Sequence, residues 1–203
     1  MNTPMAIAVG LTLGLRHATD ADHVVALATL LRRQSGLRGA LAIGGVWGIG
    51  HTLVLLAAGI AVVLLGIEVP PAFDRAAEIA VALMLVALGL RHLTRRRGEK
   101  ASAPRGPIAL RPLLIGMVHG LAGSAGVALL ALTTIRERGT AMLYLSLFGL
   151  GTVVGMMALT GLLAVPLLYA GRSPRLEVWI VRTASAASVG LGLLLAVRCS
   201  LSS

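Results

Sequence analysis

The first apolar stretch of the chain, from about residue 4 to residue 31, is interrupted by the sequence Arg16-His-Ala-Thr-Asp-Ala-Asp-His23. Two histidines and two aspartates therefore lie in the middle of a segment that is long enough to cross a bilayer. An ionisable side chain in a membrane span is costly unless it is paired or faces water, so such residues indicate a functional site. The structural alternative is a polar cluster that only ties helices together, for example through Arg16 and one aspartate. Four ionisable residues in so short a segment exceed what packing needs.

The composition of the whole chain is that of an integral membrane protein. Of its 203 residues, 57% are hydrophobic and 13% are charged, whereas soluble domains average roughly half and about a quarter. Disordered chains are less hydrophobic still. We therefore expect an all-α polytopic protein with one transmembrane domain. Its six predicted spans are the stretches at about 4–31, 39–66, 76–94, 108–135, 140–170 and 176–198.

The charge and the cysteine content limit the classes of molecule that the chain can bind. The net charge of +10 comes from basic residues that lie between apolar runs, which favours anionic lipid headgroups over nucleic acid. The single cysteine, Cys199, excludes a disulfide within the chain and a metal site built from cysteines. We expect the chain to bind the lipid bilayer and a divalent metal ion, and not nucleic acid. A homo-oligomer is compatible with the sequence.

Basic residues also predict the orientation. Twelve lysines and arginines lie in or beside the connectors after the first, third and fifth stretches, against four on the opposite side. By the positive-inside rule the first set is cytoplasmic, so both termini face outward and the segment at about 95–107 is a cytoplasmic basic loop. Residues 1–21 lack the basic start of a signal peptide, so we expect them to be retained.

The two halves of the sequence resemble each other. At an offset of 102 residues, Gly14-Leu-Arg-His17 aligns with Gly116-Met-Val-His119, and at an offset of 101, Trp47-Gly-Ile-Gly50 aligns with Phe148-Gly-Leu-Gly151. A weaker match aligns Gly89-Leu90 with Gly190-Leu191. Each copy holds three predicted spans, an odd number, so we expect inverted repeats at about 4–94 and 108–198. Inverted repeats place their substrate site near the bilayer midplane, where the halves meet.

The polar residues differ between the copies. Asp20, Asp22 and His23 become Ala122, Ser124 and Ala125, and His51 becomes Thr152. The first copy therefore keeps the candidate ligands, and the second keeps mainly a scaffold.

Helical geometry leaves two arrangements open for the first motif. At 100° per residue, His17, Asp20 and His23 share one face, and Asp22 falls away from it. Either Asp22 supports the site from outside, or the helix is unwound here and both sides point inward. Non-helical backbone at this depth is tolerated where it lines a cavity.

The donors in this motif are imidazole nitrogens and carboxylate oxygens, which suit divalent ions such as Ni²⁺, Co²⁺, Zn²⁺ or Cu²⁺. Glycines beside His51 permit close helix approach, which would bring His51 to the motif; the alternative is a histidine hydrogen-bonded between helices. The predicted metal ligands are His17, Asp20, Asp22, His23 and His51, with His119 and Ser124 on a transport path.

A family resemblance rests on these motifs. His17, Asp22 and His23 resemble the signature of the nickel/cobalt transporter family, a histidine, four residues and then Asp-His. Gly48-Ile-Gly-His51 resembles the family's second motif, a Gly-His pair on the following helix. The segment His119–Ser124 is similar to the short six-span relatives encoded with urease or hydrogenase genes, whereas the larger members have eight spans and further Asp-containing motifs that this chain lacks.

The resemblance implies a transporter that imports Ni²⁺ or Co²⁺ across a bacterial inner membrane. The ion is the transported substrate, no prosthetic group is implied, and the link to urease or hydrogenase maturation is indirect.

Two other functions compete with import. Metal exporters often carry a histidine-rich loop, and the segment at about 95–107 has no histidine. An intramembrane metal- or haem-binding protein that does not transport would use the same histidines. No His-Glu-x-x-His motif is present, so we expect no metalloenzyme.

Overall fold

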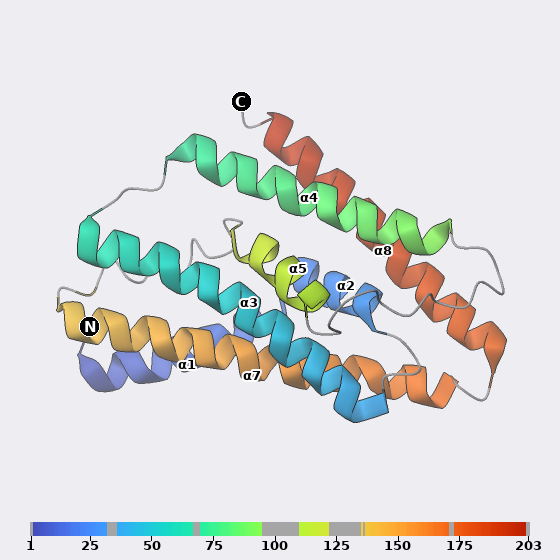
Figure 1. Cartoon of the computed structure of the whole chain (residues 1–203), viewed down its shortest axis with the longest axis horizontal. Helices are drawn as coiled ribbons and strands as arrows, with labels where there is room; N and C mark the ends of the chain where they lie inside the picture. Colours follow the sequence, from blue (N-terminus) through green and yellow to red (C-terminus); the bar gives the residue numbers. More distant parts are fainter. Residues whose placement is uncertain are drawn as a thin grey trace.

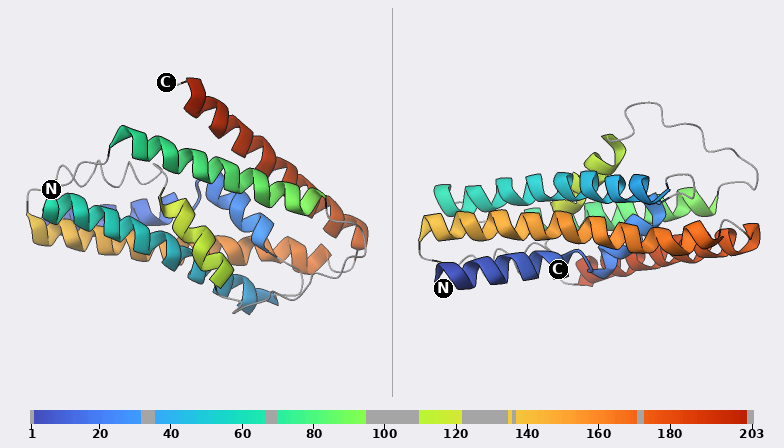
Figure 2. Two further views of the ribbon diagram at one scale, coloured as in Figure 1. Left: turned by 45° about the horizontal axis from the view of Figure 1, so that its top comes forward. Right: turned by 90° about the horizontal axis from the view of Figure 1, so that it is seen from below.

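A computed structural model of the chain describes residues 2–31, 36–66, 70–94, 110–121, 135, 137–170 and 173–201, and this part is all-helical (Figure 1). Its helices are α1 (Thr3–His17), α2 (Ala21–Leu30), α3 (Gly36–Leu65), α4 (Pro71–Leu93), α5 (Leu110–Gly120), α7 (Arg138–Ala170) and α8 (Pro174–Leu201). The long helices lie side by side, and the two short helices α2 and α5 lie about half-way along the bundle (Figures 1 and 2).

Four helices are long and apolar enough to cross a membrane. They contain Gly36–Leu65, Ala72–Leu93, Arg138–Pro166 and Val178–Leu201, with mean hydropathies from 1.7 to 2.3. Large apolar side chains on their outer faces are exposed, for example Leu65 at 70%, Leu162 at 69% and Trp179 at 65%. Exposed apolar area on this scale is what a lipid-facing surface provides. The expectation of a helical membrane protein is therefore confirmed at this level.

The first predicted span, at about 4–31, is two helices, so the chain adopts the second of the two alternatives, in which the helix is unwound at the motif. α1 ends at His17 and α2 begins at Ala21. After α1, backbone amides bond to the carbonyl three residues earlier instead of four. The Thr19 amide donates to the Arg16 carbonyl at 2.9 Å, and the Asp20 amide donates to the His17 carbonyl at 3.1 Å. The Thr19 hydroxyl also donates to Arg16. Backbone groups freed by the break are thus satisfied locally, as burial requires.

The fourth predicted span is described only in part. α5 covers Leu110–Gly120, whereas the remainder of the stretch, including Ser124, lies outside the described residues apart from Leu121 and Ile135. The basic loop predicted at about 95–107 also lies outside them.

Glycines bring the helix backbones together, and the same contacts recur in the two halves. A methyl group at Gly14 of α1 would overlap the Phe148 carbonyl of α7, and one at Gly116 of α5 would overlap the Trp47 carbonyl of α3. Two further contacts follow the same offset, those of Gly151 with Leu11 and of Gly50 with Leu113. The α1–α7 contact is therefore repeated, residue for residue, in the α5–α3 contact.

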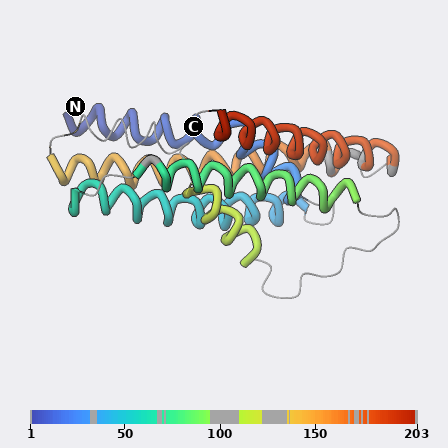
Figure 3. Tube along the Cα trace, turned by 90° about the horizontal axis from the view of Figure 1, so that it is seen from above, coloured from blue at the N-terminus to red at the C-terminus, as the bar shows by residue number. Residues whose placement is uncertain are grey.

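The glycine contacts also give the helix directions. Gly10 and Gly14 of α1 face Tyr144 and Phe148 of α7, in the same order, so these helices are parallel. α3 and α7 are antiparallel, and so are α4 and α8, as the tube view shows (Figure 3). The contacts behind this are Gly44 with Thr160, Gly59 with Leu145, Gly89 with Ser185, and Gly192 with Ala82.

Two larger apolar clusters form most of the core, and a small third one contains Leu31, Ala40 and Ala164. One of the larger clusters gathers around Tyr144 and Phe148 of α7 with Leu55 of α3, and the other around Trp47 with Leu27, Leu85 and Met156. The buried histidines described next lie where these clusters meet, because their aromatic neighbours belong to both.

Candidate metal centre

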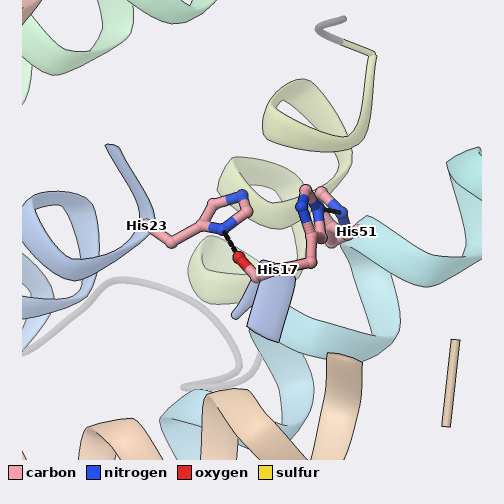
Figure 4. Close-up of side chains that lie close together, drawn as sticks. All are labelled: His17, His23 and His51. Atoms are coloured by element: carbon pink, nitrogen blue, oxygen red, sulfur yellow. Dashed lines mark hydrogen bonds between the residues drawn. The ribbon is translucent and has the colours of Figure 1, made fainter. Parts of the chain in front are cut away.

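Four buried histidines from four helices converge half-way along α3. They are His17 at the end of α1, His23 on α2, His51 on α3 and His119 near the end of α5, and they are 6%, 0%, 0% and 0% exposed. The ring centre of His17 lies 4.6 Å from that of His23 and 5.0 Å from that of His51, while His23 and His119 are 4.7 Å apart. Figure 4 shows the side chains of His17, His23 and His51 close together.

His23 is held with one nitrogen free to coordinate. Its Nδ1 donates to the main-chain carbonyl of His17 at 2.7 Å, a carbonyl that the break after α1 leaves accessible (Figure 4). Because a carbonyl only accepts, the proton of the neutral ring is on Nδ1 and the lone pair is on Nε2. That Nε2 is buried and has no hydrogen-bond partner in the described part of the chain. A buried acceptor of this kind is costly in a purely structural histidine.

His17 is oriented in the same way by a carboxylate. Its Nδ1 donates to Asp20 Oδ2 at 2.9 Å, which leaves Nε2 for other contacts. That Nε2 lies 3.0 Å from His51 Nε2. Two imidazole nitrogens bound to one ion at about 2.1 Å and at a right angle would be about 3.0 Å apart. The pair is therefore spaced like two ligands of one metal ion, and an ion entering between them would release the shared proton.

Asp22 also points inward, which decides between the two arrangements that helical geometry left open. Its Oδ2 accepts a hydrogen bond from His119 Nε2 at 2.8 Å. The ideal-helix angle failed because α2 starts a new helix after the break, so residues 17 and 22 do not share one axis. Asp22 and Asp20 each accept from an imidazole, an arrangement that fixes ring orientation in metal sites.

Two compact groups in the described residues have the composition of a metal site. The ligand atoms of His17, His23 and His51 lie within 4.8 Å of one another, and so do those of Asp22, His23 and His119. The two groups contain four of the five predicted ligands, and His119, which the sequence placed on a transport path; Asp20 is in neither group. It lies at the edge of the centre, with its side chain 44% exposed.

Two aromatic side chains that we did not single out as site residues close the centre. Trp47 stacks on His51 with ring centres 5.8 Å apart and meets the His23 ring nearly edge-on. Phe148 covers His17 from the opposite side at 5.4 Å. The repeat alignment already paired Trp47 with Phe148, and that pairing was the signal that could have found them. These rings surround the imidazoles with apolar surface and so strengthen electrostatic interactions inside the centre.

The helices α1 and α5 both end at the centre. α1 ends at His17 and α5 ends just after His119, so the carbonyl ends of both helices lie beside the imidazoles. The carbonyl end of a helix carries a partial negative charge that favours a cation by about 0.3–1 kcal/mol at an exposed site, and more where water is excluded. These two carbonyl ends suit a cation, whereas the amino end of α2 at Ala21 carries the opposite partial charge and has Asp20 and Asp22 beside it.

Comparison with known proteins gives one strong similarity. No protein-family model and no solved structure matches the chain. The chain is 31% identical over 185 residues to the urease accessory protein UreH of Bacillus sp. (strain TB-90), a match that covers 84% of this chain and 81% of that protein. It is 26% identical over 205 residues to the chloroplast protein FOR GROWTH AND FERTILITY 2 of Arabidopsis thaliana, covering 93% of this chain and 55% of that protein.

Proposed function

The chain belongs to the family of the urease accessory protein UreH, and from that premise we propose that it is a secondary-type transporter that imports Ni²⁺ or Co²⁺ across a bacterial inner membrane. The observation that carries the proposal is the convergence of His17, His23 and His51, buried and spaced like ligands of one ion, at a break between two helices. A site for a structural ion would need no such break.

The donor set supports a divalent transition metal as the substrate. His17, His23 and His51 would supply the nitrogen ligands, which suit nickel and its neighbours better than calcium or magnesium. The carboxylates of Asp22, which is mostly buried, and of Asp20, at the partly exposed edge, would together offset the charge of a divalent ion. The name of the Bacillus relative favours nickel, because a urease accessory role is met by supplying the metal of a nickel enzyme.

The packing supports a six-span architecture built from two inverted repeats, and the charge distribution supports both termini outside. The glycine contacts of α1 with α7 recur in α5 with α3. In addition, α3 is antiparallel to α7, its counterpart in the second repeat, and α4 is antiparallel to α8. Transporters of this construction hold their substrate at a broken helix between the repeats and expose it to each side in turn. His51, half-way along α3, would then lie near the midplane.

The proposal is tested by metal uptake in cells that express the chain. Trace radioactive nickel would be supplied, with cobalt and zinc as competitors, to cells carrying the wild type, His17→Ala or His51→Ala. We expect nickel accumulation in the wild type and its loss in both variants. The matched control is His92→Ala, which removes a histidine on α4 outside the centre and should accumulate nickel normally.

The membrane level of each variant would be measured by immunoblot, so that lost uptake is not confused with lost protein. A fall in cellular nickel on expression of the wild type would instead show export. An unchanged nickel content together with a haem absorbance band in the purified protein would show a haem protein that does not transport.

A further inference from the structure

We infer that the centre contains two overlapping metal positions that share His23, and that the ion passes from one to the other during transport; this rests on the proposed function. The inner position is formed by His17, His51 and His23, all through nitrogen. The second is formed by Asp22, His119 and His23, and includes an oxygen. In each group the ligand atoms lie within 4.8 Å of one another.

The two positions are carried by different helices. His17 and His51 belong to α1 and α3, whereas Asp22 and His119 belong to α2 and α5. The backbone between α1 and α2, at residues 18–20, is not helical. A shift of α2, which carries Asp22 and His23, would therefore change how the two ligand groups are spaced without breaking a helix or the glycine contacts of α3 with α5. Non-helical segments of this kind are where such motion is absorbed.

His23 has the properties that a shared ligand needs. Its ring lies between the two groups, 4.6 Å from the His17 ring and 4.7 Å from the His119 ring. Its Nδ1 is anchored to the His17 carbonyl across the break, and its buried Nε2 has no partner among the described residues. One nitrogen is therefore available to both groups, and the ion can exchange its other ligands while it stays bound to His23.

The two ligand groups also differ in charge, so they would hold the ion with different strengths. The inner group is neutral when its imidazoles bind metal, whereas the second contains the Asp22 carboxylate. His119 also donates to that carboxylate, so an ion in the second position would have to replace this hydrogen bond. For the second position, the attraction of the carboxylate is offset by the loss of this hydrogen bond. Two positions of moderate affinity suit transport, because a single deep site would bind the ion too tightly to release it.

The test compares nickel binding with nickel uptake in substitutions that break one group or both. His51→Gln breaks the inner group, His119→Gln breaks the second, and His23→Gln or the double variant His51→Gln/His119→Gln breaks both. Binding of Ni²⁺ to the purified full-length chain in detergent would be measured by calorimetry. The number of bound imidazoles would be counted by X-ray absorption at the nickel edge.

We expect each single variant, His51→Gln and His119→Gln, to keep nickel binding within about tenfold of the wild type, because one complete group remains. The imidazole count should fall in His51→Gln and stay unchanged in His119→Gln. Binding should drop by at least about 100-fold in His23→Gln and in the double variant. Uptake in cells should be lost in all four. His17→Gln and Asp22→Asn serve as second variants of the two groups if a histidine substitution alters the elution profile, and His92→Gln is the control.

Two results would overturn the inference. One is loss of binding in either single variant, which would mean a single site. The other is wild-type binding and uptake in both His119→Gln and Asp22→Asn, which would mean that the second group holds no ion. If the wild type shows no uptake, the proposed function fails, and the binding measurements still decide whether two positions exist.

Discussion

The α1–α7 contact and the α5–α3 contact are built alike, yet their equivalent positions are not all chemically equal. Gly14 and Gly116 pack against the carbonyls of Phe148 and Trp47, and each contact ends at a histidine, His17 or His119. Beyond that point the halves diverge, because His51 on α3 has Thr152 as its equivalent on α7. The Thr152 hydroxyl donates to its own helix at Phe148 and offers the centre nothing.

The comparison shows that the residues that pack the helices and the residues that could bind a metal ion can change independently. The glycine contacts set how closely the helices approach, and both halves need them equally. The ligands of the proposed site are needed once, because one ion would bind between the halves. A duplicated scaffold can therefore keep its contacts in both copies while, among the described residues, one copy keeps a single candidate ligand, His119.

The largest effect is expected from making the first half resemble the second. His51→Thr replaces the ligand with the side chain found at the equivalent position, and we expect nickel uptake to fall by at least about 100-fold while the protein remains folded. A threonine fills less space than histidine, so part of the Trp47 stacking is lost as well. Uptake of radioactive nickel, normalised to membrane level, measures the change. Uptake near the wild-type value would remove His51 from the path.

The next effect concerns the shared scaffold. Gly14→Ala and Gly116→Ala each place a methyl group against a backbone carbonyl that cannot move aside without shifting a helix. We expect each to destabilise the fold by about 1–3 kcal/mol, and by similar amounts, because the contacts are equivalent. Thermal stability of the detergent-solubilised protein, followed by size-exclusion chromatography after heating, gives the measurement.

Gly190→Ala is the matched control for the scaffold prediction. Gly190 aligns with Gly89, but a methyl group there would meet nothing within 4 Å, whereas one at Gly89 would meet the Ser185 carbonyl at 2.6 Å. Gly190→Ala should therefore leave stability unchanged or raise it by about 0.5–1 kcal/mol through helix propensity. Equal losses in Gly190→Ala and Gly14→Ala would contradict the role given to the close contacts.

A smaller effect is expected at the edge of the centre. Asp20 orients His17 but is partly exposed, so Asp20→Asn keeps an acceptor for the His17 Nδ1 proton while removing one negative charge. We expect nickel affinity to fall by about tenfold, at the low end of the range for groups that hold a ligand in place. Calorimetric titration with Ni²⁺ measures it. A loss as large as that of His51→Thr would instead make Asp20 a direct ligand.

The sequence predicted the apolar helices well and the site in part. Stretches such as 39–66 and 140–170 were found because apolar length is a local property that needs no knowledge of neighbours. The placement of Asp22 could not be predicted, since the angle calculation assumes one continuous helix. His119 and Trp47 joined the centre only through the α3–α5 contact, between residues that are far apart in the chain. The count of six spans stays a prediction.

By itself, the sequence determined that this chain enters a membrane and that its ionisable residues there need partners. The reason is that the free energy of moving a side chain from water into the bilayer depends mainly on the type of that residue. Only the tertiary structure decided which partners they find. The end of α1 at His17 frees the carbonyl that His23 uses, and the restart of the helix at Ala21 turns Asp22 toward His119. The close packing of α3 on α5 then brings His51 and His119 to either side of His23. Such convergence depends on where helices break and cross, which is a property of the whole bundle.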